Sequence, residues 1–432
     1  MTADMPAEDT SSRQTFLFLQ GPSSPLFARI ADNLQRFGHR CVRINLCAGD
    51  WVFWRRPGAI NYRGQVDHWP AFVAEVMDRE GVTGIVLLGE ERPHHVAAIA
   101  AAKARNVTVY AVEMGYLRPD WIRIEKGGSG HHSHFPVDPE MILRAASELP
   151  EPDLSVHYSQ TFVSDAIYDL MFNLPNVFAW FFYPHYRWHA IFHPLAEYYG
   201  WIGRLLNGKR RAVEAEETIA SVVDGPDPYF VMPLQLETDY QIRSYSVFRS
   251  QRTAIKLVIS SFADHAQPNA RLLIKVHPLD NGLIKWSDEI KAHAQRHSVA
   301  DRVHFVDGGN LNRMVSQSAG VVTINSTAAM IGLQRGIPVK TLGLAIYDIP
   351  GMTDDQPLDR FWREAKAPNA ELVGAFVRLV AATVHVRGNF YSDTGVDAGA
   401  AAIAKRLHEK SVNEPGGYVE KPQRSRPDKD LF

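Results

Sequence analysis

The sequence predicts an α/β protein made of two doubly wound domains in series. Three observations predict this class. The chain has 432 residues, which is more than one ordinary hydrophobic core accommodates. Short apolar runs alternate with amphipathic helical patterns, as is typical of a parallel sheet covered by helices on both faces. This alternation occurs twice, so we expect two such domains with a cleft between them.

The first alternating block spans residues 14–150. One helix is predicted at 26–37, where apolar residues recur at helical spacing and Gly38 follows as a stop. A second helix is predicted at 93–105, because Pro93 suits the first turn of a helix. The apolar runs around them predict four strands: QTFLFLQ (14–20), RCVRINL (40–46), GIVLLG (84–89) and NVTVYAVE (106–113).

The second alternating block spans residues 226–390. Its helices are expected near 246–266, 284–296, 311–318 and 327–335. The strands between them are PYFVMPLQ (228–235), ARLLIKVHP (270–278), RVHFVDG (302–308), GVVTINS (320–326) and PVKTLG (338–343). Residues 1–13 are polar and predicted to be disordered. Residues 391–432 are predicted to form a C-terminal helix and a polar tail, with the last twenty residues disordered.

The segment between the blocks, residues 151–225, is rich in aromatic side chains. Twelve of the chain's 45 aromatic residues (21 Phe, 15 Tyr and 9 Trp) lie between Phe172 and Trp201, and a basic cluster follows at once. This composition is typical of a segment at a bilayer interface, but it also fits a buried helix pair that bridges two domains. The candidates for membrane docking are Trp180, Phe181, Phe182, Trp188, Lys209, Arg210 and Arg211.

Charge and cysteine content exclude several classes of protein. The formal net charge is -2, so no global basic field indicates nucleic acid as a partner. The two cysteines, Cys41 and Cys47, show no disulfide framework, which favours a reducing compartment. The polar start does not resemble a signal peptide, and no apolar run approaches the roughly 20 residues of a membrane span. We therefore expect a cytoplasmic protein, soluble or peripheral to a membrane.

Several common site motifs are missing from the sequence. No G-x-G-x-x-G follows the first strand, and there is no P-loop and no G-x-S-x-G elbow. The Asp-x-Asp pair at Asp428 and Asp430 lies in the polar tail, where it cannot hold a divalent ion at a strand end. The histidines between His131 and His134 lack further ligands at metal spacing and fit a polar loop. We expect neither a metal nor a cofactor.

Three features of the second block follow predicted strands and therefore lie on one edge of the sheet. His277 and Pro278 end one strand, and an imidazole there can hold a phosphate while proline fixes the turn. Ser326 and Thr327 follow another strand and open a helix, where hydroxyls and free N–H groups bind anions, although Ser326 also suits a simple N-cap. The third feature, Gln235 and Asp239, follows the first strand of the block.

The first block places a carboxylate at its own sheet edge. Gln20 and Gly21 end the first strand and Glu113 ends the fourth, with Arg118 close behind. Glu113 is either the last residue of a buried strand or a catalytic acid. A carboxylate acts as nucleophile or base, and arginine binds a substrate carboxylate bidentately, so the pair suits the transfer of an acidic sugar.

Seven motifs carry a further resemblance: FLFLQGPSSPLFARIADNLQRFGH, NYRGQVDHWPAF, EMGYLRPDWI, PLQLETDYQIR, IKVHPLD, TINSTAAMIGLQRGIPVKTLG and AIYDIPGMTD. In this order they resemble the capsule polysaccharide biosynthesis and export family, in its single-module KpsS/LipB branch, from about residue 14 to 385. The resemblance implies a metal-independent, retaining glycosyltransferase of GT-B-like architecture, with two Rossmann-like domains facing a cleft. Its implied reaction moves β-Kdo from CMP-Kdo to a phosphatidylglycerol-type lipid at the cytoplasmic face of the inner membrane.

The resemblance also assigns residues. It implies that His277-Pro278 and Ser326-Thr327 bind the CMP-sugar, and that the first domain holds the acceptor and the catalytic acid. Related two-module Kdo transferases carry Glu-Asp-Gly-Phe where this chain has Glu113-Met114-Gly115-Tyr116, and their second acid is the catalytic one. Because Met114 takes that place, three alternatives are open: Glu113 is the catalytic carboxylate, Glu125 shortly downstream is, or this branch positions its acid differently.

The resemblance extends to partners and leaves two alternatives open. The implied partners are the inner-membrane surface, the capsule ABC transporter and the oligo-Kdo transferase machinery, and a lipid acceptor favours membrane docking by the aromatic segment. One alternative is a related transferase that uses another CMP-sugar. The other is a non-catalytic scaffold of the export machinery, which the Met114 departure favours.

Overall fold

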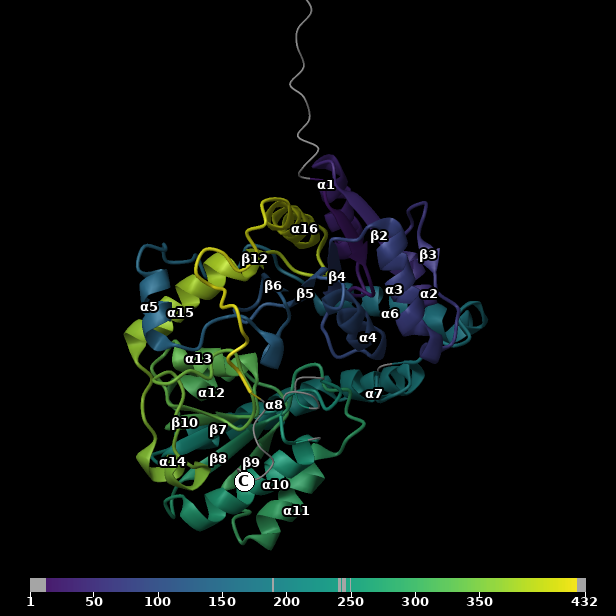
Figure 1. Ribbon diagram of the computed structural model, residues 1–432. Helices are drawn as coiled ribbons and strands as arrows, with labels where there is room; N and C mark the ends of the chain where they lie inside the picture. Colours follow the sequence, from purple (N-terminus) through teal and green to yellow (C-terminus); the bar gives the residue numbers. More distant parts are fainter. Residues whose placement is uncertain (1–12, 189, 240–241, 243–245, 249, 426–432) are drawn as a thin grey trace, which may run out of the picture. The chain divides into compact units, whose positions relative to one another are not determined.

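The computed structural model describes residues 13–188, 190–239, 242, 246–248 and 250–425, and these divide into two compact units. Unit 1 is formed by Met1–Ser129, Leu154–His189 and Val384–Asn413. Unit 2 is formed by Gly130–Asp153, Ala190–Thr383 and Glu414–Phe432. Each unit is built on its own sheet (Figure 1). The predicted disorder of residues 1–13 falls almost entirely outside the described residues.

Unit 1 contains a seven-stranded sheet of order β12-β6-β5-β4-β1-β2-β3 among its described residues. Strands β1 to β5 pair in parallel, whereas β6 is antiparallel to β5 and β12 is antiparallel to β6. The strands are β1 Thr15–Phe18, β2 Arg40–Asn45, β3 Ile60–Asn61, β4 Gly84–Leu88, β5 Thr108–Met114, β6 Trp121–Lys126 and β12 His385–Arg387.

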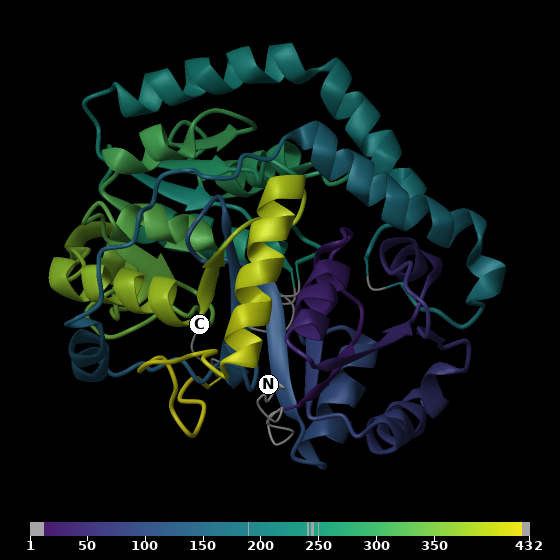
Figure 2. The same ribbon diagram turned by 90° about the horizontal axis from the view of Figure 1, so that it is seen from above.

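Helices cover both faces of the unit 1 sheet. Phe16 and Phe18 of β1 pack toward α1 and α16, whereas Leu17 and Leu19 pack toward α3 and α4, so both faces of one strand are apolar. Figure 2 shows α16 lying alongside α1. The helices of the unit are α1 Leu26–Arg36, α2 Ala48–Phe53, η2 Val66–His68, α3 Trp69–Glu80, α4 Pro93–Lys103, α6 Phe162–Phe178, η4 Trp180–Phe182 and α16 Asp393–His408.

The described residues of unit 2 form a five-stranded, wholly parallel sheet of order β11-β10-β7-β8-β9. Its strands are β7 Tyr229–Pro233, β8 Arg271–Lys275, β9 Val303–Val306, β10 Gly320–Thr323 and β11 Val339–Thr341. One sheet face packs against α10, α11 and α14 around Phe262, Trp286 and Trp362. The helices are η3 Gly130–His132, α5 Pro139–Ala146, α7 Pro194–Leu206, α8 Gly208–Val223, α10 Gln251–His265, α11 Trp286–Arg296, α12 Leu311–Ser316, η5 Thr327–Ala329, α13 Met330–Leu333, α14 Leu358–Glu364 and α15 Ala370–Thr383.

The predicted fold class, two doubly wound α/β domains, is confirmed. The strands expected from apolar runs are present in both units, within a few residues of their expected ends. The sequence reading missed β6 and β12, which add an antiparallel edge to the unit 1 sheet. The cleft between the domains stays a prediction.

The units follow boundaries other than the predicted ones. Residues 384–413 were expected in or after the second domain, but β12 pairs with β6 and α16 packs on α1, so they belong to unit 1. Helix α5 packs against α15 and belongs to unit 2. The expected linker, 151–225, is divided, since α6 lies in unit 1 while α7 and α8 lie in unit 2.

The prediction of a disordered tail over the last twenty residues is wrong for residues 413–425. The buried guanidinium of Arg424 donates to the carbonyl oxygens of Phe135 and Ile346 at 2.5 and 2.8 Å. The backbone N–H of Val419 donates to the carbonyl of His134 at 2.8 Å. A polar composition predicted disorder, but these side chains and amides satisfy carbonyl groups of unit 2. Asp428 and Asp430 lie outside the described residues.

Candidate active site

The two sheets share one arrangement at their carboxyl edges. In each unit the first strand lies between the second and the fourth, so the strand order reverses beside it, at β1/β4 in unit 1 and at β7/β10 in unit 2. Ligands of open α/β sheets bind at such a reversal, outside the carboxyl ends of the strands. In each unit a glutamine follows the first strand by two residues: Gln20 after β1 and Gln235 after β7.

Both glutamines bridge the reversal by hydrogen bonds. Arg92, which follows β4, donates from Nη1 to Oε1 of Gln20 at 2.8 Å. In unit 2, Nε2 of Gln235 donates to Oδ1 of Asn325 at 2.9 Å, and the backbone N–H of Asn325 donates back to Oε1 of Gln235 at 3.3 Å. The side chain of Gln251 accepts from the backbone N–H of Gln235 and donates to its carbonyl oxygen, which fixes the position of Gln235. Two predicted residues therefore lie at the positions where this fold binds ligands.

Carboxylates gather around one arginine at the unit 1 edge. Glu113 is the last residue but one of β5 and forms an ion pair with Arg123 of β6, its partner across the antiparallel pair. Arg123 also lies 3.1 Å from Oε1 of Glu125, which in turn accepts a hydrogen bond from the Tyr116 hydroxyl at 2.9 Å. The guanidinium stacks over the Tyr116 ring at 4.5 Å. Arg123 and Glu125 are buried, whereas the Glu113 side chain is 26% exposed, so Glu113 presents this cluster to solvent.

A further carboxylate, Glu90, joins this cluster from the loop after β4. It is 3% exposed, and one of its oxygens accepts hydrogen bonds from the backbone N–H and the hydroxyl of Ser129, at 2.6 and 2.8 Å. Burial raises the pKa of Glu90 to about 7, and the charge of Glu125 acts in the same direction, while Ser129 and Arg123 oppose the shift. Glu90 therefore exchanges a proton near neutral pH, as a general acid or base requires.

Gly89 allows the two glutamates to approach each other. It has φ +62°, and a Cβ there would lie 2.9 Å from Oε1 of Glu113. The Glu113 carboxylate thus lies directly over the backbone that leads into Glu90. Glycine is required both for this left-handed conformation and for the close contact.

The edge is completed by His385 from β12, 269 residues downstream of Tyr116. Its Nε2 accepts a hydrogen bond from the backbone N–H of Tyr116 at 3.0 Å. Burial lowers the pKa of His385 well below its usual value, and the charges of Arg123, Arg406 and Arg118 add to this effect. A neutral imidazole therefore fixes the turn that follows β5.

Arg118 and Met114 lie next to this cluster. Arg118 is exposed, and its Nη1 lies 3.0 Å from the sulfur of Met114. The second acid of the two-module pattern is therefore replaced by a thioether in contact with an arginine. The sequence reading named Glu113, Glu125 and Arg118 but missed Glu90 and Arg123; the signal for Glu90 was a carboxylate directly after a buried strand.

The residues of unit 2 that were predicted to bind the CMP-sugar differ in their surroundings. Ser326 caps η5, because its hydroxyl accepts from the N–H of Ala328 at 3.2 Å. His277 follows β8, and its Nδ1 accepts from the N–H of Leu279 at 3.1 Å, which leaves Nε2 as the outer ring nitrogen. Pro278 is exposed and Thr327 is partly exposed beside them. Asp239 closes a short turn by donating its N–H to the carbonyl of Leu236 at 2.9 Å.

Arg211, predicted as part of a membrane-docking basic cluster, is engaged inside unit 2. Its Nη1 lies 3.0 Å from Asp307, directly after β9, and Arg204 contacts the same carboxylate at 2.7 Å. The neighbouring Lys275 is buried, and burial lowers its pKa. Of the cluster, Lys209 and Arg210 remain as exposed cations on α8.

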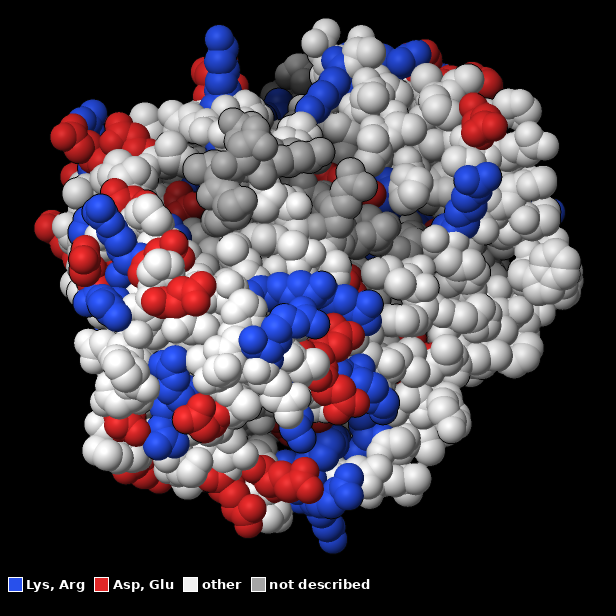
Figure 3. Space-filling model, turned by 90° about the horizontal axis from the view of Figure 1, so that it is seen from below, with Lys and Arg blue, Asp and Glu red and all other residues white. Residues whose placement is uncertain are grey.

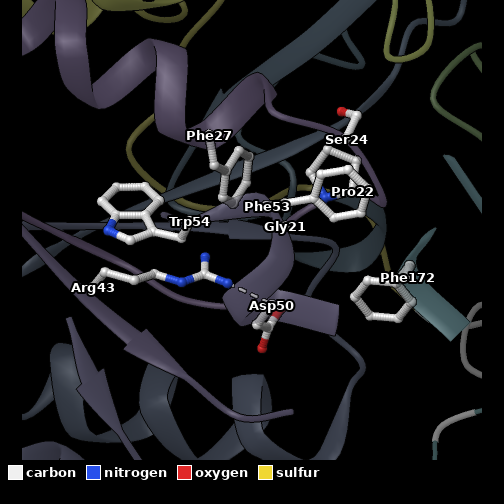
Figure 4. A pocket seen from close by; sticks show the side chains of 9 residues that line it. All are labelled: Gly21, Pro22, Ser24, Phe27, Arg43, Asp50, Phe53, Trp54 and Phe172. Carbon is white, nitrogen blue, oxygen red and sulfur yellow. Dashed lines mark ion pairs between the residues drawn. The ribbon is translucent and has the colours of Figure 1, made fainter. Parts of the chain in front are cut away.

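A hollow beside Gly21 is lined by Phe27, Trp54 and Phe172 together with the buried ion pair of Arg43 and Asp50 at 2.9 Å (Figure 4). It encloses about 10 Å³, room for about one water molecule, so it does not hold a substrate as it stands. Gly21 itself packs tightly, since a Cβ there would lie 2.7 Å from the Phe27 ring.

The geometry defines a class of protein: two doubly wound α/β units, each with a glutamine bridge at its strand reversal, and one with a carboxylate cluster beside it. The chain belongs to the capsule polysaccharide biosynthesis protein family, which matches residues 83–391. This confirms the resemblance read from the sequence motifs.

Individual relatives cover most of the chain. The capsule polysaccharide modification protein LipB of Neisseria meningitidis serogroup B is 33% identical over 394 residues, which cover 88% of this chain and 92% of LipB. The capsule polysaccharide export protein KpsS of Escherichia coli is 29% identical over 387 residues, which cover 88% of this chain and 97% of KpsS. Among solved structures, the β-Kdo 2,7 transferase KpsC of Thermosulfurimonas dismutans aligns over 92% of this chain and 99% of its own, with a TM-score of 0.43 and 15% identity.

Proposed function

We propose that this protein is a glycosyltransferase that moves β-Kdo from CMP-Kdo to a phosphatidylglycerol-type lipid and so starts a capsule linker. One observation carries the proposal: Glu113 and Glu125 pair with Arg123 at the carboxyl edge of unit 1, beside the strand reversal, and the charges of Glu125 and Arg123 act on the buried Glu90. Membership of the capsule polysaccharide biosynthesis family supports the biological setting. Paired carboxylates with different environments are the usual equipment for glycosyl transfer.

The carboxylates divide the chemistry between them. Glu113 is the partly exposed member, and its pairing with Arg123 fixes its orientation, so it serves as the nucleophile. Its oxygen bonds to the anomeric carbon of Kdo, while the bond from that carbon to the CMP phosphate breaks and CMP leaves with the electron pair. The acceptor hydroxyl oxygen then bonds to the anomeric carbon, the bond to Glu113 breaks, and configuration is retained overall.

The proton of the acceptor hydroxyl passes to Glu90. A carboxylate with a pKa near 7 accepts this proton efficiently at neutral pH. Arg118, exposed beside Met114, is proposed to bind the carboxylate of Kdo bidentately. Glu90 thereby supplies the ionisable group that Met114 lacks.

Unit 2 is proposed to bind the CMP moiety. Gln235 and Asn325 bridge the strand reversal, where nucleotide ligands lie in doubly wound folds. His277, Pro278, Ser326 and Thr327 stand at the same carboxyl edge as candidate phosphate contacts, with Asp239 in the turn after β7. No metal or cofactor enters the proposed reaction.

The lipid acceptor requires the protein to meet a membrane surface. No helix in the described ranges is long and apolar enough to cross one. Instead, apolar side chains at helical spacing are exposed along α6, at Val163, Ile167, Met171 and Phe178, and Trp180, Phe181 and Phe182 of η4 are 62%, 59% and 52% exposed. Charged side chains are sparse over part of the face shown in Figure 3. We assign these residues to peripheral association with the inner membrane, near the capsule transporter and the oligo-Kdo transferase machinery.

The test is a transfer assay with defined substrates. Incubation with CMP-Kdo and a short-chain phosphatidylglycerol is expected to give the lipid with one added Kdo by mass spectrometry, and NMR of the product is expected to show the β configuration. A product only with another CMP-sugar would assign a different donor. CMP binding without turnover on any acceptor would identify a scaffold and refute the transferase.

A further inference from the structure

Unit 1 contains a pocket that shares no lining residue with the carboxylate cluster. It encloses about 140 Å³, whereas about 10–15 Å³ is enough for one water molecule, so it accommodates a small organic group. It lies where the loop after β2 meets the end of α6, η4 and the segment after it. It is lined by Cys47, Ala48, Asn176, Ala179, Trp180, Tyr183, Pro184, Tyr186 and Trp188.

The pocket contains a buried hydrogen-bond donor in need of an acceptor. Asn176 is 4% exposed, and its Oδ1 accepts from the backbone N–H of Gly49 at 2.8 Å, which fixes Nδ2 as the free end of the amide. Within the part of the chain that the structure describes, Nδ2 has no hydrogen-bond partner by distance and angle, although the Asn176 side chain lies close enough to the Cys47 thiol to lower its pKa as a hydrogen-bond neighbour. Burial raises the pKa of the Cys47 thiol well above its usual value, so this neighbour stays neutral and is a weak acceptor. A ligand oxygen is therefore the better partner for Nδ2.

Hydrogen bonds fix the tyrosines that line the pocket and connect one of them to Gln20 at the strand reversal. The Tyr183 hydroxyl donates to Oδ1 of Asn61 at 2.7 Å. The Tyr186 hydroxyl accepts from Nε2 of Gln20 at 3.2 Å, and Gln20 accepts from Arg92, two residues beyond Glu90. One hydrogen-bonded chain thus joins the pocket wall to the loop that carries the proposed proton acceptor.

The buried charges near the pocket favour a neutral group. Arg43 and Asp50, both buried, pair with each other at 2.9 Å and so bring no net charge to a phosphate, while the exposed Arg63 lies 6.0 Å from the centroid of the Tyr183 ring. Aromatic walls with one placed polar donor suit the C–H faces and hydroxyl oxygens of a polyol. At the rim, Trp180 is largely exposed and is followed by the exposed rings of Phe181 and Phe182, which suit hydrocarbon.

We propose that this pocket binds the polyol end of a hydroxylated phospholipid headgroup and thereby presents its hydroxyl to the Gln20–Glu90 edge. This inference rests on the proposed function, since it locates the acceptor of that reaction. Asn176 donates to one polyol oxygen, the rings of Tyr183, Tyr186 and Trp188 enclose the carbon backbone, and the acyl chains stay outside.

Filling the pocket tests the inference without removing any contact. Ala179→Leu replaces a methyl group of the lining by a larger side chain that fills part of the pocket. Ala212→Leu makes the same change at an exposed position of α8 in unit 2. Binding of dihexanoyl-phosphatidylglycerol below its micelle concentration is measured by tryptophan fluorescence and calorimetry, without donor. We expect Ala179→Leu to weaken binding at least about tenfold and Ala212→Leu to leave it unchanged. Trp188→Ala, which removes a ring from the lining, is expected to weaken binding as well, and circular dichroism checks the fold of each variant.

Competition distinguishes the headgroup from the chains. Glycerophosphoglycerol, which has no acyl chains, is expected to compete, whereas dihexanoyl-phosphatidylcholine is not. Equal competition by the choline lipid, or wild-type binding by a folded Ala179→Leu variant, would overturn the inference.

The same variants separate this inference from the transferase proposal. If the wild type transfers Kdo, Ala179→Leu is expected to raise the KM for the lipid about tenfold and to leave the KM for CMP-Kdo unchanged. An unchanged lipid KM would refute the pocket while the transferase stands. A third outcome is that the wild type binds the lipid but transfers no Kdo, and that Ala179→Leu abolishes this binding. It would support the pocket and refute the transferase.

Discussion

Replacing Glu90 by glutamine is expected to make the protein more stable and less active at the same time. Glutamine has the size of a protonated glutamate and accepts the two Ser129 hydrogen bonds, but it cannot exchange a proton. Burial is the main cause that raises the pKa of the wild-type carboxyl to about 7, from an ordinary value of 4.5. Between these pH values the folded protein retains a proton that the unfolded chain releases.

The sign and size of the stability effect follow from linkage. Because the folded state binds more protons than the unfolded state between pH 4.5 and 7, wild-type stability falls as the pH rises through this range. The pKa shift of Glu90 corresponds to a contribution of about 3 kcal/mol to the free energy of unfolding. This contribution is fully present below pH 4.5 and lost above pH 7. The Glu90→Gln variant has no such titrating group, so its stability does not fall in this way. Its free energy of unfolding is expected to exceed that of the wild type by up to about 3 kcal/mol at pH 8.5 and by little at pH 5.

Denaturant unfolding at pH 5 and pH 8.5 measures this difference, and the transfer assay measures activity. Removal of the general base is expected to lower kcat by about 10²–10⁴-fold. Glu91→Gln, at the adjacent and partly exposed glutamate, is the matched control and is expected to change neither quantity. An unfolding midpoint of Glu90→Gln that changes with pH as much as that of the wild type would refute the assignment of Glu90 as the buried titrating group. Full activity of the variant would remove it from proton transfer.

Three further predictions follow from the same geometry. Arg123→Met leaves Glu125 buried without its counter-ion and is expected to lower the free energy of unfolding by about 3–5 kcal/mol, whereas Arg79→Met, in an exposed pair, is expected to cost less than about 1 kcal/mol; denaturant titration checks both. Gln235→Ala breaks the bridge to Asn325 and is expected to weaken CMP binding about tenfold in calorimetry; unchanged affinity would place the nucleotide elsewhere. Serine at all three η4 positions, 180–182, is expected to reduce binding to phosphatidylglycerol vesicles and to spare CMP binding, with Phe37→Ser as the exposed control; full vesicle binding by the folded triple variant would reject η4 as the docking segment.

The fold was readable from the sequence where strands are buried on both faces. Runs such as FLFL and GIVLL are apolar throughout, and β1 and β4 lie at the centre of the unit 1 sheet. The antiparallel edge was not readable, because β6 contains the charged residues Arg123 and Glu125 and β12 has three residues contributed by a distant part of the chain. A polar strand of this kind is stabilised by its ion pairs, and no periodicity reveals which partner a charge will meet.

The candidate site was readable in part for the same reason. Strand ends predict the sheet edge, so Gln20, Glu113 and Gln235 were placed there correctly. The environment of a side chain is a property of the folded state, so the burial of Glu90 and the engagement of Arg211 by Asp307 were not predictable. The basic residues 209–211 were predicted to face a membrane, but Arg211 pairs with Asp307, a carboxylate 96 residues further along the chain.

The most direct test of the central claim is the mass of the lipid product formed from CMP-Kdo by the wild type and by Glu113→Gln. We expect one added Kdo on a short-chain phosphatidylglycerol with the wild type, and no product with a folded Glu113→Gln variant that still binds CMP. Release of CMP without a lipid adduct, or full activity of Glu113→Gln, would contradict the central claim.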